Sequence, residues 1–256
     1  MNGGSQPLLK HFVVTGIPKS GTLYLARSVS MNLNLNPTFE FRIGSRGFTK
    51  SQVQADRLEE LINGSARVLQ EHIAPTEYNL SLLKFFGLNK FVLTLRDPRD
   101  VICSLRFHLH REDARKPWHI SMSQASGLID ESFYGQPVNV QFDILIANAF
   151  PRLQSWTAAW IRWLDDPELD IHLVCYEYFS KNNEAAVRAI LQFFGNDCGS
   201  AIVLPRIEPS IKGIDLSTHF RKGQPGSFRE ELSQQQLQRL AKMIDHKLYK
   251  RMSWEA

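Results

Sequence analysis

Residues 11–22, HFVVTGIPKSGT, decide the fold. The first five form a short apolar run that predicts a buried strand, and a glycine follows that strand at once. A helical pattern begins at Thr22, so the stretch predicts a strand, a tight loop and a helix N-terminus. Backbone N–H groups and the positive end of the helix dipole make such an arrangement an anion-binding site.

The side chains of this loop suit a phosphate group. Gly16 and Gly21 allow the backbone to turn close to a ligand, Lys19 adds a positive charge, and Ser20 and Thr22 add hydroxyl donors. The spacing is close to the nucleotide-binding pattern G-x-x-x-x-G-K-[ST], but the lysine has moved back to position 19. A strand–helix turn that uses glycine, proline and serine only for its shape is the alternative interpretation.

Three further apolar runs predict strands of a largely parallel sheet, at 67–71, 91–95 and 171–176. Helical patterns are expected at 22–33, 52–62, 75–86, 100–108, 184–194 and 234–249. This alternation predicts an α/β fold with a central, mostly parallel sheet flanked by helices. Ligands of such folds bind at the carboxyl ends of the strands.

A second phosphate-binding element begins at Arg96, with the sequence RDPRDVICS. Arg96 ends the strand predicted at 91–95, and Ser104 lies two turns into the helix that follows. An arginine fork with a nearby hydroxyl can hold a phosphate. The alternative is a solvated helix cap in which Arg96 and Arg99 pair with Asp97 and Asp100.

The composition is that of an ordinary globular chain. Hydrophobic residues are 43% of the 256 residues and charged residues 22%, which excludes general disorder and suits one domain over residues 1–256. The net charge of +4 suits a small anionic ligand and is too small to indicate nucleic-acid binding.

Sequence patterns also bear on location. The N-terminus lacks the pattern of a signal peptide, and no apolar run reaches the about 18 to 20 residues that span a bilayer. The three cysteines are widely spaced and fit a reducing compartment. We therefore expect a cytoplasmic protein with neither a membrane nor a nucleic acid as partner.

Taken in order, these elements resemble the PAPS-dependent sulfotransferase family, in particular its soluble cytosolic branch. The loop TGIPKSGTLY resembles T-Y-P-K-S-G-T-T-W, and RDPRDVICS matches R-x-x-x-D-x-x-x-S. The family also has a C-terminal R-K-G-x-x-G-D-W-K signature, a Y-E pair after a late strand and a Trp-rich helix. Their counterparts here are HFRKGQPGSFREEL at 219–232, Tyr176-Glu177, and Trp156 with Trp160.

The resemblance implies a P-loop-like three-layer fold and 3′-phosphoadenosine 5′-phosphosulfate (PAPS) as co-substrate, with no metal. The residues it implies for the 5′-phosphosulfate are Lys19, Ser20, Gly21 and Thr22, with Leu23 and Tyr24 completing the loop. Tyr24 stands where the family has an adenine-stacking tryptophan, and Tyr176 is expected at the adenine edge. The 3′-phosphate is expected to bind Arg96, Ser104, Arg221, Lys222 and Gly223.

The same resemblance implies the catalytic residues. His72 matches the family's general base, Lys19 is expected to stabilise charge on the departing oxygen, and Ser104 is expected to couple cofactor binding to the lysine. Gln70 replaces a lysine of the family. The expected reaction is in-line transfer of a sulfuryl group to a hydroxyl or amine, with adenosine 3′,5′-bisphosphate (PAP) as product.

Two other functions remain open. A P-loop kinase or NTPase would need a lysine at position 22 and a Mg²⁺-binding aspartate at a strand end. A non-catalytic nucleotide-binding protein would keep the phosphate sites without the base, so His72 argues against it.

Residues 106–148 are expected to form a lid and much of the wall for a small-molecule acceptor, because long excursions with weak periodicity are usually functional or mobile. The histidines and aromatic residues of this segment are either acceptor contacts or surface residues; they are His108, His110, Trp118, His119, Phe133 and Tyr134. Ser227 and Phe228 replace the family's D-W, and the mammalian dimer segment is missing. The chain therefore resembles a bacterial small-molecule or natural-product sulfotransferase, with its oligomeric state open.

Overall fold

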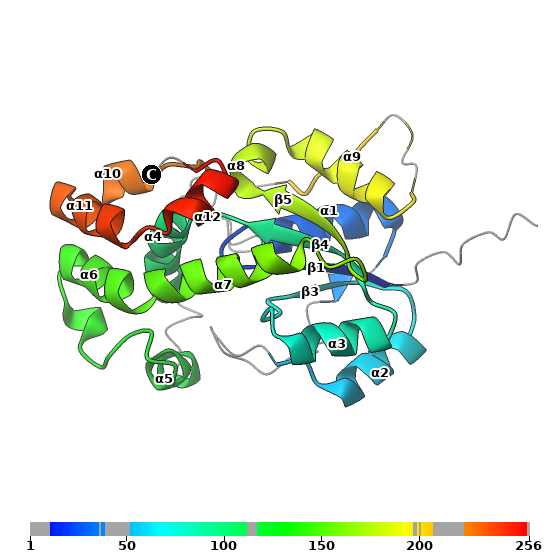
Figure 1. The fold of residues 1–256 in the computed structure, drawn as a ribbon, viewed down its shortest axis with the longest axis horizontal. Coiled ribbons are helices and arrows are strands. Elements are labelled where there is room, and N and C mark those ends of the chain that lie inside the picture. The colour runs from blue at the N-terminus through cyan, green and yellow to red at the C-terminus, as the bar shows by residue number, and fades with distance from the viewer. Residues whose placement is uncertain are drawn as a thin grey trace, which may run out of the picture.

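Parallel strands build the centre of the molecule. The computed structural model describes residues 11–35, 37–38, 52–111, 117–196, 199, 201–206 and 223–254. Within these residues one five-stranded sheet has the order β2-β3-β1-β4-β5, and every neighbouring pair is parallel (Figure 1). The strands are β1 His11–Gly16, β2 Pro37–Thr38, β3 Arg67–Glu71, β4 Lys90–Leu95 and β5 Asp170–Cys175.

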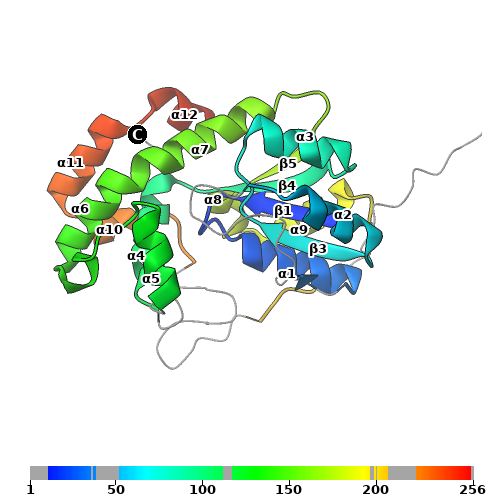
Figure 2. The ribbon, with the colours of Figure 1, turned by 90° about the horizontal axis from the view of Figure 1, so that it is seen from below.

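Helices cover both faces of the sheet. In chain order they are α1 Thr22–Leu33, α2 Ala55–Asn63, α3 Glu77–Phe85, α4 Pro98–Leu109, α5 Pro117–Ala125, η1 Phe133–Gly135, α6 Val138–Asn148, α7 Phe150–Trp163, α8 Tyr176–Phe179, α9 Asn183–Phe193, α10 Phe228–Glu231, α11 Gln234–Met243 and α12 His246–Arg251. Figure 1 shows α9 on one side of the strands and α2 and α3 on the other, and Figure 2 views the sheet from the side of α2 and α3. Helix α1 packs against α9, and α7 shares an apolar cluster with α3. None of these helices is both long and apolar enough to span a bilayer, among the residues described.

Alternation along β1 explains the two layers of packing. Phe12 and Val14 belong to the apolar cluster shared with α1 and α9, whereas Val13 belongs to the larger cluster shared with α3, α4 and α7. Successive side chains of a strand point to opposite faces, so a wholly apolar strand must be covered on both. The expected three-layer α/β fold is confirmed.

The expected elements agree with the structure except near the C-terminus, in the segment 106–148 and at β2, a two-residue edge strand that was not expected. The helix expected at 234–249 is two helices, because the Asp245 side chain accepts hydrogen bonds from the backbone of Lys247 and Leu248 and so starts α12. The segment 106–148 contains α5, η1 and α6 rather than a featureless excursion. Its periodicity is weak because α6 packs against both α4 and α7.

The carboxyl ends of four strands meet at one edge of the sheet. Register places Gly16 opposite Thr94, and Leu95 opposite Cys175. The loop after β1, His72 after β3, Arg96 after β4 and α8 after β5 therefore gather at one edge. This is where ligands bind in open parallel sheets.

Candidate active site

The loop between β1 and α1 is pressed against β4. A Cβ atom on Gly16 would lie 2.2 Å from the carbonyl oxygen of Thr94, so only glycine fits. Gly21 has φ 86° and precedes α1 without a side-chain cap, and a Cβ atom there would lie 2.7 Å from the ring of Phe179. The loop therefore leads into the N-terminus of a 12-residue helix, which is the geometry that binds anions.

Two hydroxyl groups of this loop are held by neighbouring residues. The Ser20 hydroxyl donates to the carbonyl oxygen of Ile17 at 2.7 Å and lies 2.6 Å from the Thr94 hydroxyl. The Gln70 amide donates to Thr22 Oγ1 at 3.2 Å. Ser20 thus stabilises the shape of the loop, and its expected contact with a phosphosulfate stays a prediction. Gln70, which replaces the family's lysine, reaches the same loop.

His72 is joined directly to the loop. Its Nδ1 atom lies 2.8 Å from the carbonyl oxygen of Gly16, and the next residue, Ile73, donates its N–H to the Thr15 hydroxyl at 3.0 Å. A carbonyl oxygen can only accept, so in the neutral ring Nδ1 carries the hydrogen and Nε2 carries the lone pair. The ring is therefore held in the tautomer that a proton acceptor at Nε2 requires.

Arg96 lies across the same edge of the sheet. Its Nη1 atom donates to the carbonyl oxygen of Lys19 at 3.1 Å, and the guanidinium lies 4.0 Å from the ring centroid of Tyr176. Its Nε atom is buried and has no hydrogen-bond partner within the described ranges. Buried donors are normally satisfied, so this N–H is a candidate contact for a phosphate oxygen.

The alternative interpretation of this element as a solvated helix cap is wrong, because the side chains that pair are buried and not exposed to solvent. Both arginines do pair: Arg99 Nη2 lies 2.7 Å from Asp97 Oδ2, and Arg96 Nη2 lies 3.9 Å from Asp100 Oδ2. All four of these side chains are buried. The Arg99 guanidinium lies between the rings of Phe228 and Tyr249, at 4.2 and 4.9 Å from their centroids. Arg99 therefore holds the C-terminal helices against α4, whereas Arg96 faces the loop.

Asp100 connects the second phosphate element to the C-terminal signature. Its carboxylate accepts hydrogen bonds from Gly226 N at 2.6 Å, Ser227 Oγ at 3.0 Å and Phe228 N at 3.1 Å. The carboxylate is 1% exposed, so these bonds replace water. They fix the end of the R-K-G-x-x-G segment beside α4.

For three more of the residues expected to bind the cofactor, the structure gives a position, a burial or a backbone angle. Ser104 is half-buried two turns into α4, Leu23 is half-buried in α1, and Gly223 has φ 65° just before the anchored segment. Arg221 and Lys222 lie outside the described residues. No hydrogen bond of Ser104 is recorded within the described ranges, and its coupling to Lys19 stays a prediction.

The Y-E pair joins β5 to β4. The Glu177 carboxylate accepts the Asp97 N–H at 2.8 Å, and its burial raises its pKa. Tyr176 packs edge-on against Phe179 with centroids 5.3 Å apart, and Tyr24 lies 5.9 Å from the same ring. Both tyrosines are 8% exposed, so most of their surface is committed to packing, and their contacts with adenine stay predictions.

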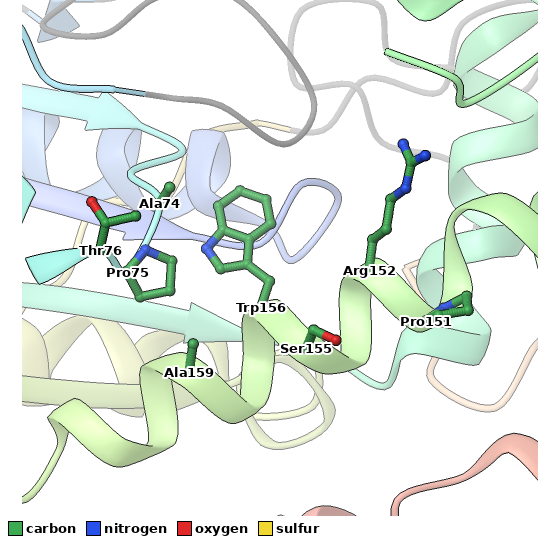
Figure 3. A pocket seen from close by; sticks show the side chains of 8 residues that line it. All are labelled: Ala74, Pro75, Thr76, Pro151, Arg152, Ser155, Trp156 and Ala159. Carbon is green, nitrogen blue, oxygen red and sulfur yellow. The ribbon is translucent and has the colours of Figure 1, made fainter.

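A cavity of about 510 Å³ opens beside the segment that follows His72. Its lining comes from the segment after β3 and from one face of α7, and consists of Ala74, Pro75, Thr76, Pro151, Arg152, Ser155, Trp156 and Ala159 (Figure 3). The cavity begins two residues beyond His72 and has the size of a small-molecule site. It is therefore a candidate acceptor pocket.

The aromatic residues expected to line a lid instead pack on one another. His110 Nε2 lies 2.8 Å from Gln141 Oε1, and the His110 ring lies 6.0 and 5.5 Å from the rings of Phe133 and Tyr134. Phe133 is fully buried. Phe133 is thus not a surface residue, whereas His110 and Tyr134 are half-buried, and contacts of these residues with an acceptor stay a prediction. The side chains of Trp118 and His119 lie outside the described residues.

Sequence reasoning missed several residues of this edge. From the sequence, Asp100 was expected only as an ion-pair partner of a neighbouring arginine, although it binds residues more than 120 positions away. Arg152 carried no local signal beyond its charge. Spacing of three and four residues along α7 could have predicted a shared face for Arg152, Ser155 and Trp156, but not what that face meets.

Metal ligands do not gather at this edge. Within the described ranges, no group of three or more His, Cys, Asp or Glu side chains could hold a metal ion.

Comparison with known proteins agrees with the architecture. The chain matches the family described as Sulfotransferase domain over residues 9–252. It is similar to mouse sulfotransferase SULT7A1 complexed with PAP, at 15% identity and a TM-score of 0.56, over 95% of this chain and 88% of the other. No curated protein matches the chain in sequence.

Two more solved structures share the fold. A sulfotransferase from Alicyclobacillus acidocaldarius is similar at 15% identity and a TM-score of 0.53, over 98% of each chain. Retinol dehydratase in complex with androsterone and inactive cofactor PAP is similar at 14% identity and a TM-score of 0.53, over 96% of this chain and 82% of the other.

Proposed function

Because the chain belongs to the sulfotransferase family, we propose that it transfers the sulfuryl group of PAPS to a hydroxyl or amine of a small-molecule acceptor. One observation carries the proposal: the loop after β1 is hydrogen-bonded on one side to His72 and on the other to Arg96. The proposed base and a proposed phosphate ligand thus share one rigid loop. The shared loop favours transfer chemistry over mere nucleotide binding.

Residues at this edge suit PAPS as co-substrate. The N-terminus of α1 with Lys19 suits the 5′-phosphosulfate, and the buried Nε of Arg96 suits the 3′-phosphate. Two similar structures, the mouse sulfotransferase and retinol dehydratase, hold PAP. Arg221 and Lys222 are proposed to complete the 3′-phosphate site, since Asp100 fixes the segment just after them.

The proposed mechanism assigns one step to each residue. PAPS supplies an activated sulfuryl group whose bridging oxygen leaves as negative charge develops. His72 Nε2 takes the proton from the acceptor hydroxyl or amine as its oxygen or nitrogen bonds to sulfur. Lys19 and the N–H groups of α1 stabilise the charge on the departing oxygen. No metal enters these steps.

Two cysteines and one similar structure bear on the cellular context. Cys103 and Cys175 are free thiols, which supports a reducing, cytoplasmic environment. The full mutual coverage with a bacterial sulfotransferase supports a compact enzyme of that type, acting on a small molecule such as a natural product.

Cofactor binding gives the first test. PAP should raise the melting temperature by mass action on the folded state, and ATP at equal concentration should raise it less because it lacks a 3′-phosphate. Differential scanning fluorimetry measures both shifts, with AMP as a second control. An equal or larger shift with ATP would contradict the PAPS proposal and favour a kinase or NTPase.

Arg96 gives the second test. Replacing Arg96 with alanine should weaken PAP binding by about 1.5–3 kcal/mol, the usual value of a hydrogen bond to a charged group. Isothermal titration of PAP and AMP measures the loss, which should appear mainly for PAP. The exposed Arg162 provides a matched control as Arg162→Ala. An unchanged Kd for PAP in Arg96→Ala would remove Arg96 from the cofactor site.

A further inference from the structure

The candidate acceptor pocket has two unlike ends. Ala74 and Pro75, which follow His72 closely in the chain, form one end, and the proposed function places the sulfated group of the acceptor on this side. Figure 3 shows the Trp156 ring between this segment and Arg152, with both side chains projecting from α7 to the same side. Arg152 precedes Trp156 by four residues, which is about 6 Å along a helix. The pocket therefore runs from the segment that follows His72 toward Arg152.

Arg152 carries the only charge among the lining residues. Its Nη1 atom donates to the Ser126 carbonyl oxygen at 2.6 Å, and it takes part in no ion pair of the described residues. The guanidinium has five N–H donors in a rigid fork. A half-buried guanidinium beside apolar walls attracts an anion more strongly than a fully hydrated one does.

Trp156, which also lines the pocket, has an N–H group whose hydrogen bond is unsatisfied within the described ranges. Its Nε1 atom is buried and has no hydrogen-bond partner among the residues described. Buried indole N–H groups usually find a partner. Arg152 and Trp156, each with an N–H group that can donate, thus both line a cavity that has no carboxylate in its lining. A ligand with several oxygens that accept hydrogen bonds would complement this lining.

We infer that the acceptor carries an anionic group, a carboxylate, that binds Arg152, in addition to the hydroxyl or amine that is sulfated next to His72. This inference rests on the proposed sulfotransferase function. Trp156 covers the apolar body between the two groups and donates its N–H to an oxygen of the acceptor. Arg152 is then a specificity-determining residue. It selects acceptors that carry a carboxylate on an apolar body, together with the hydroxyl or amine, over neutral alcohols and amines.

Arg152 also has a structural contact, so the test must separate the two roles. The bond to Ser126 ties α7 to the turn after α5, and a Cβ atom on Gly127 would lie 3.2 Å from Nη2 of Arg152. A purely structural arginine would affect all acceptors alike when replaced. An arginine that binds the acceptor would affect only those that carry the anion.

The experiment compares matched acceptor pairs, each a carboxylate and its primary amide, such as 3-(4-hydroxyphenyl)propanoate and 3-(4-hydroxyphenyl)propanamide, within a panel of aryl and alkyl alcohols and amines. Affinity is measured by titration into the PAP-loaded protein, and kcat/KM by PAP release from PAPS. We expect the wild type to prefer the carboxylates by about tenfold or more, as a charge-assisted hydrogen bond implies. Arg152→Met should abolish this preference and leave PAP and amide binding unchanged.

Two further variants complete the design. Arg152→Lys should keep part of the preference because it keeps the charge, and the exposed Arg162→Met on the same helix should keep all of it. Equal binding of carboxylates and amides by the wild type, or a preference that survives in Arg152→Met, would overturn the inference. Failure of the wild type to bind PAP would instead overturn the proposed function, so the two failures are distinguishable.

Discussion

His72→Ala is expected to lower kcat by about 10²- to 10⁴-fold, the usual range for loss of a general base, while the Kd of PAP stays close to that of the wild type. The expectation follows from the 2.8 Å contact between Nδ1 and the Gly16 carbonyl oxygen, which leaves the lone pair on Nε2. Steady-state turnover with a working acceptor and titration of PAP measure the two quantities.

The matched control is His110→Ala. His110 is hydrogen-bonded to Gln141 and packed on two aromatic rings. It belongs to the segment that we expect to form part of the acceptor wall, so its loss should alter the KM of the acceptor and leave kcat nearly unchanged. The acceptor used must have a pKa well above the assay pH, because an acceptor that is already ionised needs no base. Near-normal kcat in His72→Ala, with a collapse in His110→Ala, would show that the base was assigned to the wrong histidine.

Local sequence signals predicted the framework because they act over a few residues. The apolar run at 67–71 is a strand with the same bounds, and the helix expected at 22–33 has the same bounds as α1. Alternation of strands and helices then predicts parallel pairing, and parallel pairing brings the loop after β1, His72 and Arg96 to one edge. The meeting of these residues was thus predictable from topology without any distance.

Contacts between distant segments were not predictable in this way. Asp100 binds Gly226 through Phe228, and Glu177 binds the backbone of Asp97, across separations of 126 and 80 positions. A carboxylate in the first turn of a helix has an adequate local explanation in the helix dipole, so nothing in the sequence indicates a distant partner. The role of Arg152 was hidden for the same reason, because a cavity is a property of packing.

Arg96 shows how the two kinds of information combine. Its position after a strand predicted a phosphate ligand, and the structure adds that Nη1 holds the carbonyl oxygen of Lys19. Arg96, which we propose as a ligand of the 3′-phosphate, thus also holds the backbone of Lys19, which we propose to stabilise the departing oxygen. Arg96 therefore connects the proposed 3′-phosphate site to Lys19 through one side chain, and the contribution from Ser104 that the resemblance implies stays a prediction.

Lys19→Met should lower kcat by about 10²- to 10³-fold, the usual loss when one preorganised donor to a developing charge is removed, and should raise the KM for PAPS far less. Charge on the bridging oxygen grows as the sulfur–oxygen bond breaks, so a cation held beside it acts on the transition state more than on the bound cofactor. The backbone supports this placement, since Lys19 has φ 68° and its carbonyl oxygen is fixed by Arg96.

Lys19→Arg is the matched control, because it keeps a positive charge at the same left-handed backbone position. It should recover part of kcat, whereas methionine keeps only the length of the side chain. Initial rates over a range of PAPS concentrations separate kcat from KM for both variants, and titration of PAP gives the ground-state affinity. If the KM for PAPS carries the whole loss and kcat is unchanged, Lys19 only binds the cofactor, and the charge on the departing oxygen must be stabilised by the N-terminus of α1 alone.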